Sequence, residues 1–129
     1  VAKKLISKMK KEKISITNSK ILIMGFAFKE NCQDIRNTRV IDIITKLKTK
    51  KCLIDIYDPL INSKDCMNEY SLRIIKYPYL LKYDSIIIAV AHSVFKKLGL
   101  DRIKKFGKKK CIIFDVKNIF DNKNVDITL

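Results

Sequence analysis

The sequence has 129 residues, of which 47% are hydrophobic and only three are Gly and two are Pro, so it fits one folded domain and excludes a disordered or low-complexity chain. The net charge of +15 would suit a nucleic-acid partner, but only four of the 28 basic residues are Arg, the residue whose bidentate contacts read bases and phosphates, so we expect none. The four cysteines are spread along the chain without a C-x-x-C pair, and there is a single His, so we predict a reduced cytoplasmic protein without a metal site. No apolar run approaches the length of about 20 residues that spans a bilayer, so we predict no membrane-spanning segment.

Residues 1–13 have the pattern of an amphipathic helix. Ala2, Leu5, Ile6 and Met9 recur with a period of about 3.6, and lysines occupy much of the remaining surface. Because this segment begins abruptly and carries an apolar stripe, we expect it to pack on something outside the domain or to continue a longer helix. Residues 14–19 are predicted to be a linker.

From Lys20 onward, short apolar runs alternate with helical periods. The runs at 21–24, 52–57, 85–91 and 111–116 are predicted to be strands, and 40–47 and 95–106 to be helices. Strands that are apolar on both faces and separated by helices indicate parallel pairing with crossover connections. We therefore predict a Rossmann-like, three-layer α/β domain with a mostly parallel sheet of about five strands, preceded by an N-terminal helix.

The local signals between these elements are of uneven strength. The helix at 40–47 is predicted to have Asn37 or Thr38 as its N-cap. After the second strand, Pro59 ends the pairing and Asp58 is interpreted as a turn residue. In the segment 62–83, we predict a short edge strand at 72–76 and a single helical turn at 79–83.

The loop at 25–38 follows the first strand, which is where open α/β sheets bind ligands. Gly25 is its only glycine, so it lacks the G-x-G-x-x-G sequence with which a backbone wraps a dinucleotide. It offers instead Lys29 and Arg36 near a helix N-terminus, which also favours anions. We predict a phosphate recognised by side chains; a merely solvated Lys29 is the alternative.

Five short motifs occur in order along the chain. They are Gly-Phe-Ala-Phe-Lys at 25–29, Asp-Ile-Arg-Asn-Thr at 34–38, Tyr-Asp-Pro at 57–59, Ala-Val-Ala-His at 89–92, and Asp-Val-Lys at 115–117. Together they resemble the C-terminal domain of the UDP-glucose/GDP-mannose dehydrogenases. Residues 30–42 are most similar to the subgroup that oxidises UDP-N-acetylhexosamines for Vi-type polysaccharide. The resemblance implies a UDP-sugar-binding domain at 19–129, and at 1–18 the end of a central interdomain helix with its linker.

The resemblance also implies roles for individual residues. Phe28 and Lys29 correspond to residues that contact the UDP-sugar, and Lys117 lies in the motif that supplies a further basic contact. Arg36 corresponds to an arginine that reaches toward NAD held by another domain. Asp34 is expected to orient Arg36 by a charge-assisted hydrogen bond.

Three other residues receive structural interpretations or none. His92 ends a buried strand and could act as an acid or base, but we interpret it as structural because no carboxylate or nucleophile is paired with it in the sequence. Cys32 is interpreted as a small loop residue, since the family's nucleophile lies elsewhere. Lys123 lies in a stretch too divergent to align.

For a complete enzyme, the resemblance implies NAD-dependent oxidation of UDP-glucose or a UDP-N-acetylhexosamine to the uronic acid, in polysaccharide biosynthesis, by a homodimer joined through the central helix. The family's catalytic Cys and NAD-binding domain precede this region, so we expect no catalytic residue and no activity in this chain alone. The alternative is a stand-alone or decayed nucleotide-binding module. The identity of the sugar stays open.

Overall fold

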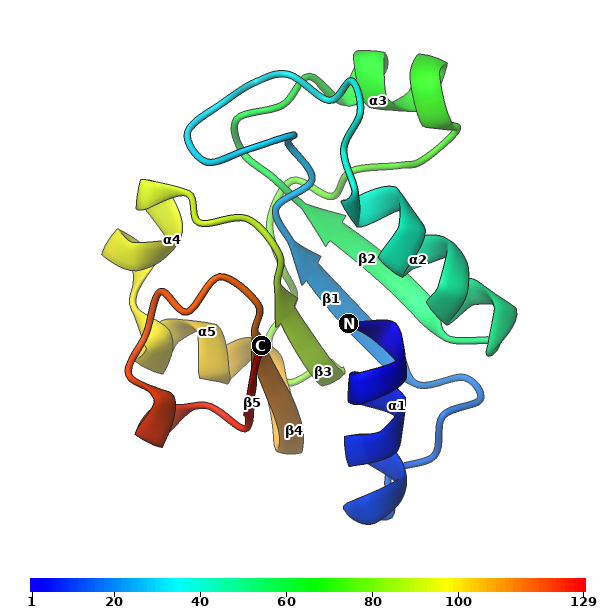
Figure 1. Ribbon diagram of the computed structural model, residues 1–129, viewed down its shortest axis with the longest axis vertical. Helices are drawn as coiled ribbons and strands as arrows, with labels where there is room; N and C mark the ends of the chain where they lie inside the picture. The colour runs from blue at the N-terminus through cyan, green and yellow to red at the C-terminus, as the bar shows by residue number, and fades with distance from the viewer.

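Five strands, all in parallel pairs, form the centre of the computed structural model, which describes residues 1–129 (Figure 1). Their order across the sheet is β2-β1-β3-β4-β5. The strands are β1 Lys20–Met24, β2 Leu53–Tyr57, β3 Tyr83–Ile88, β4 Gly107–Asp115 and β5 Ile127–Thr128. The predicted α/β class and parallel sheet are therefore confirmed.

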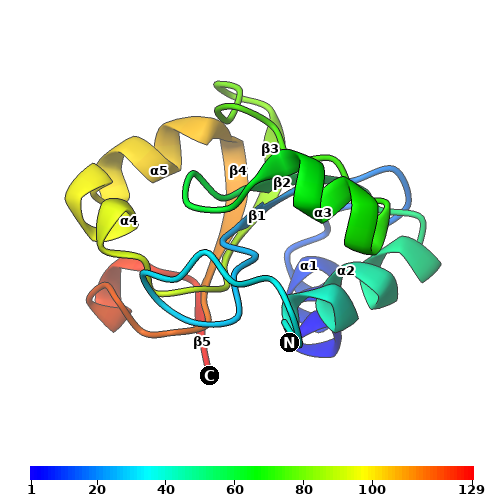
Figure 2. The same cartoon turned by 90° about the horizontal axis from the view of Figure 1, so that it is seen from above.

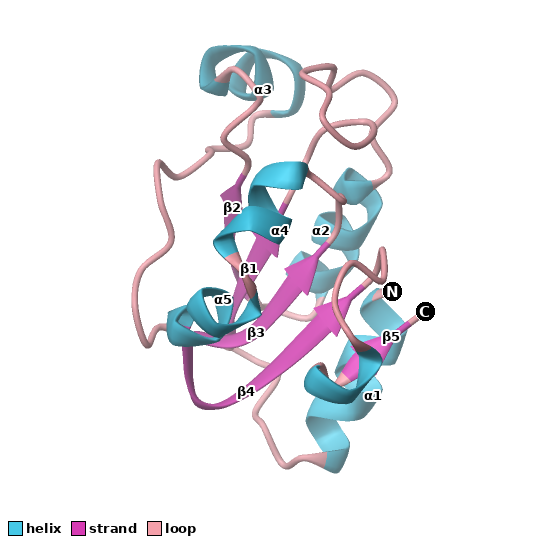
Figure 3. Cartoon of the chain, turned by 90° about the vertical axis from the view of Figure 1, so that its left-hand side faces the viewer, coloured by secondary structure: helices cyan, strands magenta, loops and turns pink.

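Helices cover both faces of this sheet (Figures 1 and 2). α1 and α2 lie on one face, α4 and α5 lie on the other, and α3 lies beyond the carboxyl end of β2. Their bounds are α1 Ala2–Lys11, α2 Val40–Thr49, α3 Ser63–Tyr70, α4 Ser93–Leu98 and α5 Leu100–Phe106, with a short 3-10 helix at Asn122–Asn124. The side view shows the same layering, with the N- and C-termini near each other (Figure 3).

The continuous apolar run of β1 serves two separate cores. Ile21 and Ile23 belong to the cluster under α1 and α2, whereas Leu22 and Met24 belong to the cluster under α4 and α5. Successive strand residues point to opposite faces, so a strand covered on both sides needs apolar residues at every position. This is why the strand prediction from uninterrupted Ile and Leu runs was correct.

The apolar stripe of α1 packs inside this domain, which corrects one of the two expectations for residues 1–13. Leu5 and Met9 have no exposed surface and belong to the same core cluster as Ile21 and Ile23. The helix has basic residues in its last turn, where the helix dipole favours them. The apolar side chains of α1 are thus buried without a contact to any surface outside the domain.

The segment 62–83 was predicted poorly. Asn62 caps α3 by accepting backbone hydrogen bonds from Lys64 at 2.9 Å and Asp65 at 3.1 Å. The expected edge strand at 72–76 is only a single parallel bridge between Ile56 and Ile74. The expected helical turn at 79–83 is wrong, because Leu81 has a φ of 53° and β3 already begins at the next residue but one.

Two helix boundaries also differ from the prediction. The helix expected at 95–106 is split into α4 and α5 at Gly99, whose φ of 86° and ψ of 151° are foreign to a helix. α2 begins at Val40, so its N-cap is Arg39 and neither Asn37 nor Thr38, although Thr38 Oγ1 accepts a 3.2 Å hydrogen bond from the Val40 N–H. Asn37 has a φ of 59° and belongs to the preceding turn.

Candidate functional site

The loop after β1 leaves the carboxyl edge of the sheet through Gly25. Gly25 has a φ of 98°, and a Cβ at this position would lie 2.6 Å from the Val90 Cβ. Both observations require glycine. Gly25 therefore allows the loop to pass close to the chain beyond β3. This packing role explains why one glycine is present here although the G-x-G-x-x-G sequence is absent.

A cavity of about 640 Å³ opens beside this loop. It is bounded by residues 27–30, by the start of α2, and by the segments that follow β3 and β4. Phe28, Lys29 and Lys117, the three residues predicted to contact substrate, all line it. The structure thus brings together side chains that are 88 residues apart in the chain.

The charge of this cavity suits an anion. Lys29, Arg39 and Lys117 line it against one acidic residue, Glu30. Val40 also lines it, so the N-terminus of α2, the positive end of the helix dipole, faces the same space. Arg39 was not singled out from the sequence, although its place directly before the apolar period of α2 could have indicated it.

Lys117 reaches the cavity because Asp115 shapes the turn after β4. The Asp115 side chain is fully buried and accepts hydrogen bonds from the backbone N–H groups of Ile119 at 3.1 Å and Phe120 at 2.8 Å. The carboxylate therefore satisfies the backbone of the turn that immediately follows. Val116 and Lys117 are presented at the carboxyl edge as a result.

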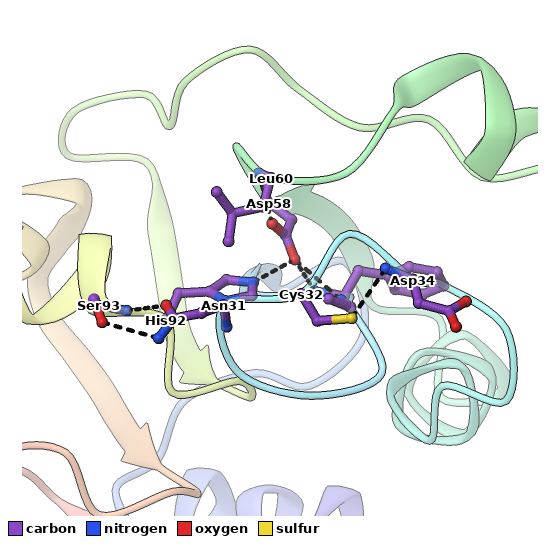
Figure 4. A network of polar contacts seen from close by, with 9 residues as sticks. Asn31, Cys32, Asp34, Asp58, Leu60, His92 and Ser93 are labelled. Atoms are coloured by element: carbon purple, nitrogen blue, oxygen red, sulfur yellow. Dashed lines mark hydrogen bonds and ion pairs between the residues drawn. The ribbon is translucent and has the colours of Figure 1, made fainter.

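Asp58 and His92 form a buried polar pair behind the loop (Figure 4). His92 Nε2 lies 2.9 Å from Asp58 Oδ2, and neither side chain has exposed surface. Burial raises the pKa of Asp58, but hydrogen bonds from His92 and from the backbone N–H groups of Phe26 and Leu60 lower it more, so the pKa lies below its usual value of 3.8. The carboxylate is held in its ionised form.

This pair corrects two arguments from the sequence. His92 does have a carboxylate partner, although its interpretation as a structural histidine stands. Asp58 is more than a turn residue, since only its 3.0 Å hydrogen bond from the Leu60 N–H belongs to the local turn. Cys32 is a free thiol whose sulfur accepts a 3.3 Å hydrogen bond from the Asp34 N–H, a contact within the loop.

Arg36 lies apart from the cavity. It lines a second hollow of about 480 Å³ together with Asp65 and Glu69 of the α3 region. The expected charge-assisted contact of Asp34 with Arg36 is present, and it is bidentate, since the carboxylate accepts hydrogen bonds from Arg36 Nε and Nη2, both at 3.0 Å. This pairing lowers the pKa of Asp34 and raises that of Arg36. Contact of Arg36 with NAD stays a prediction.

Lys123 is also separate from the cavity. It lines a hollow of about 410 Å³ with Lys104, Lys108 and Lys109, on the side of α5 and the start of β4. Of the two lysines near the end of the chain, only Lys117 therefore shares a cavity with Lys29.

The residues present do not form a complete NAD site. The only glycine of the loop is occupied by its contact with Val90, so no backbone cradle for a pyrophosphate exists there. No three His, Cys, Asp or Glu side chains gather in a group that could bind a metal. None of the helices has the length and apolar character needed to cross a bilayer.

Comparison with known proteins places the whole chain in one family. Residues 22–122 match the family model described as the UDP-glucose/GDP-mannose dehydrogenase family, UDP binding domain. Over all 129 residues the chain is 39% identical to UDP-N-acetyl-D-glucosamine 6-dehydrogenase of Pseudomonas aeruginosa and 40% identical to the enzyme of the same name from Salmonella typhi. It spans only 31% and 30% of the lengths of these two proteins.

Solved structures show the same fold. The UDP-D-ManNAc dehydrogenase of Pyrococcus horikoshii superimposes with a TM-score of 0.73 at 23% identity, over 92% of this chain and 26% of that one. A UDP-glucose dehydrogenase of Pyrobaculum islandicum gives the same TM-score at 18% identity, over 98% of this chain and 28% of that one. With the family motifs, the cationic cavity and the parallel sheet, these matches show that the chain belongs to the UDP-glucose/GDP-mannose dehydrogenase family and corresponds to its C-terminal UDP-binding domain.

Proposed function

We propose that this chain binds the UDP portion of a UDP-sugar in the cavity lined by Phe28, Lys29 and Lys117, and so forms one wall of the active site of an NAD-dependent UDP-sugar 6-dehydrogenase. The observation that carries the proposal is the convergence of these three residues on one cavity with an excess of cations. Its volume of about 640 Å³ lies within the ordinary range of small-molecule sites.

Each lining group has a chemical role in this proposal. Lys29 and Lys117 donate charge-assisted hydrogen bonds to the diphosphate, and the N-terminus of α2 adds its dipole. Phe28 is 52% exposed and lines the cavity, so a ligand bound there would cover its ring. Its ring offers an apolar surface to the uracil or the sugar. Arg39 supplies a third cation.

In the complete enzyme, the proposed reaction converts the sugar C6 alcohol to a carboxylate with reduction of two NAD molecules per turnover. The substrate is UDP-glucose or a UDP-N-acetylhexosamine, the latter being supported by the two relatives with about 40% identity. By the same resemblance, the enzyme would be cytoplasmic, act in polysaccharide biosynthesis and dimerise through the central helix. Arg36, oriented by Asp34, would contact NAD from this side of the cleft.

Calorimetric titration of the chain with UDP tests the binding proposal. We expect saturable binding, and an affinity about tenfold weaker for Lys29→Ala and for Lys117→Ala, because each loses a charge-assisted hydrogen bond to the diphosphate. Lys48→Ala is the matched control, since Lys48 is an exposed lysine at the far end of α2. Equal affinities for the wild type and both cavity variants would contradict the assignment.

A second measurement concerns the catalytic parts. We expect no NAD reduction when the 129-residue chain is incubated with UDP-N-acetylglucosamine or UDP-glucose, because the activated thiolate and the NAD-binding domain belong to the preceding part of the family's enzymes. Turnover by this chain alone would show that oxidation needs neither that thiolate nor the NAD-binding domain. Joining the chain to the preceding part of a relative distinguishes a working domain, which restores turnover, from a decayed module, which does not.

A further inference from the structure

We propose that Asp58 and His92 are positioning residues that hold the loop at 26–31 in the conformation that presents Phe28 and Lys29 to the ligand. The inference rests on the proposed function and adds to it two residues that make no ligand contact. Both are buried, with 2% and 0% exposure, and neither lines the cavity. They act through the backbone of the loop.

The order of the sheet explains why these two residues meet. Asp58 follows β2 and His92 lies just beyond β3, and both strands are neighbours of β1, from which the loop emerges. The loop therefore passes between the ends of its two neighbouring strands. A side chain from each side reaches it, as the close-up shows (Figure 4).

Asp58 secures the first end of the loop. Its Oδ2 accepts hydrogen bonds from the backbone N–H groups of Phe26 at 2.7 Å and Ala27 at 3.0 Å. The same oxygen lies 2.9 Å from His92 Nε2, and Oδ1 accepts from the Leu60 N–H. Because the donors on Phe26, Ala27 and His92 are buried, removal of the carboxylate would leave them without a partner.

His92 secures the second end. Its Nδ1 accepts a 2.9 Å hydrogen bond from the backbone N–H of Asn31, so the proton of the ring resides on Nε2 and is donated to Asp58. The imidazole thereby links a carboxylate, which only accepts, to an N–H group, which only donates. Asp58 itself makes no hydrogen bond with Asn31, and His92 supplies this link.

Between these attachments lies the part of the loop that faces the ligand. Phe28 is held by one backbone hydrogen bond, from its N–H to the Asp34 carbonyl at 2.7 Å, whereas Lys29 and Glu30 make no hydrogen bond within the chain. The conformation of these three residues is therefore set by the attachments at the two ends of the loop. Outside the pair, Asn31 and Ser93 exchange hydrogen bonds of 3.0 and 2.8 Å, which brace the same end against α4.

The decisive experiment compares UDP affinity and amide exchange in the same variants. We expect Asp58→Ala to weaken UDP binding about tenfold and to accelerate hydrogen exchange of the Phe26, Ala27 and Asn31 amides. Asp58→Asn keeps one carbonyl oxygen for Phe26, Ala27 and His92 and should be intermediate. His92→Asn keeps an acceptor near the Asn31 N–H but loses the hydrogen bond to Asp58. Its UDP affinity and exchange rates should also be intermediate.

Ile103→Ala is the matched control, because Ile103 is fully buried in the core cluster under α4 and α5 and does not line the cavity, so its truncation lowers stability without removing a hydrogen bond of the loop. At a temperature where all variants are folded, it should bind UDP like the wild type. Unchanged affinity in Asp58→Asn and His92→Asn, or an equal loss in Ile103→Ala, would overturn the proposal.

Two other results, an unfolded Asp58→Ala variant and a wild type that does not bind UDP, can be interpreted separately. If Asp58→Ala does not fold, Asp58→Asn and His92→Asn carry the test through the graded affinities. If the wild type itself does not bind UDP, the proposed function fails, and the exchange rates at Phe26, Ala27 and Asn31 still decide whether the pair holds the loop. Exchange unchanged at these three amides would then refute the positioning role as well.

Discussion

At the scale of single residues, the candidate site and its support combine residues that are neighbours in the sequence with two that are distant in it. Lys29, Phe28 and the Asp34–Arg36 pair lie in one loop, so motif and charge were sufficient to select them. Asp58 and His92 are separated by 34 positions and meet only because β2 and β3 flank β1. No local pattern carries that information, and each residue was therefore assigned a purely local role.

The lowered pKa of Asp58 makes a prediction for acid stability. A carboxyl group with a folded pKa below its unfolded value stabilises the fold above about pH 3.8, and this contribution is lost as the pH falls through the folded pKa. We expect the free energy of unfolding of the wild type to fall more steeply between about pH 4 and pH 2 than that of Asp58→Asn.

Urea denaturation at a series of pH values measures this difference. Asp101→Asn is the control, because Asp101 is exposed and makes no side-chain hydrogen bond, and its pH dependence should follow that of the wild type. Parallel curves for the wild type and Asp58→Asn would show that the carboxylate of Asp58 is not specifically stabilised by its buried partners.

At the scale of elements, length and burial decided which predictions succeeded. β1 and β3 are buried along nearly their whole length, whereas β2 and β4 are buried mainly toward their C-terminal ends, and the approximate positions of all four were predicted correctly. β5 has two residues, too few to produce a periodic pattern, and was missed. α3 buries only Cys66, so it has almost no apolar stripe, and its main sequence signal was the capping Asn62. The count of five strands was right although the fifth lies elsewhere.

Packing of α1 within the domain predicts a stability effect. We expect Leu5→Ala to lower the free energy of unfolding by about 2–5 kcal/mol, because Leu5 is fully buried in the main core cluster. Ser7→Ala, on the exposed side of the same helix, should change it by less than about 0.5 kcal/mol. A near-zero effect of Leu5→Ala in chemical denaturation would mean that α1 is detached in solution.

The break between α4 and α5 depends on backbone conformation alone. A Cβ at Gly99 would meet no atom within 4 Å, but its φ of 86° and ψ of 151° are accessible almost only to glycine. We therefore expect Gly99→Ala to destabilise the fold by about 1–3 kcal/mol in thermal or chemical denaturation. A neutral or stabilising result would indicate that 95–106 can form the single helix that its apolar period suggests.

At the scale of the whole molecule, the fold places the cationic cavity and Arg36 in separate positions. The ends of β1, β3 and β4 meet at one cationic cavity, the proposed site of the diphosphate. Arg36 and its hollow lie outside that cavity, on the α3 side. The fold class and the position of the candidate loop could be derived from the sequence, whereas this spatial division could not, because it depends on how α3 and α2 pack.

The net charge of +15 is the main competing explanation for any binding of UDP, since lysines also line the hollow that contains Lys104, Lys109 and Lys123. General attraction by these charges should weaken steeply with salt and should favour no particular surface. Specific binding should select the cavity beside the loop. The location of the bound ligand therefore distinguishes the two.

NMR titration of the isotopically labelled chain with UDP at physiological ionic strength is the most direct test of the central claim. We predict that the amide shifts that change most will be those at residues 27–30, with Val40 and Lys117, and that the changes will saturate. Changes centred on Lys104, Lys109 and Lys123, or a uniform and unsaturable drift, would contradict the assignment of this cavity as the UDP site.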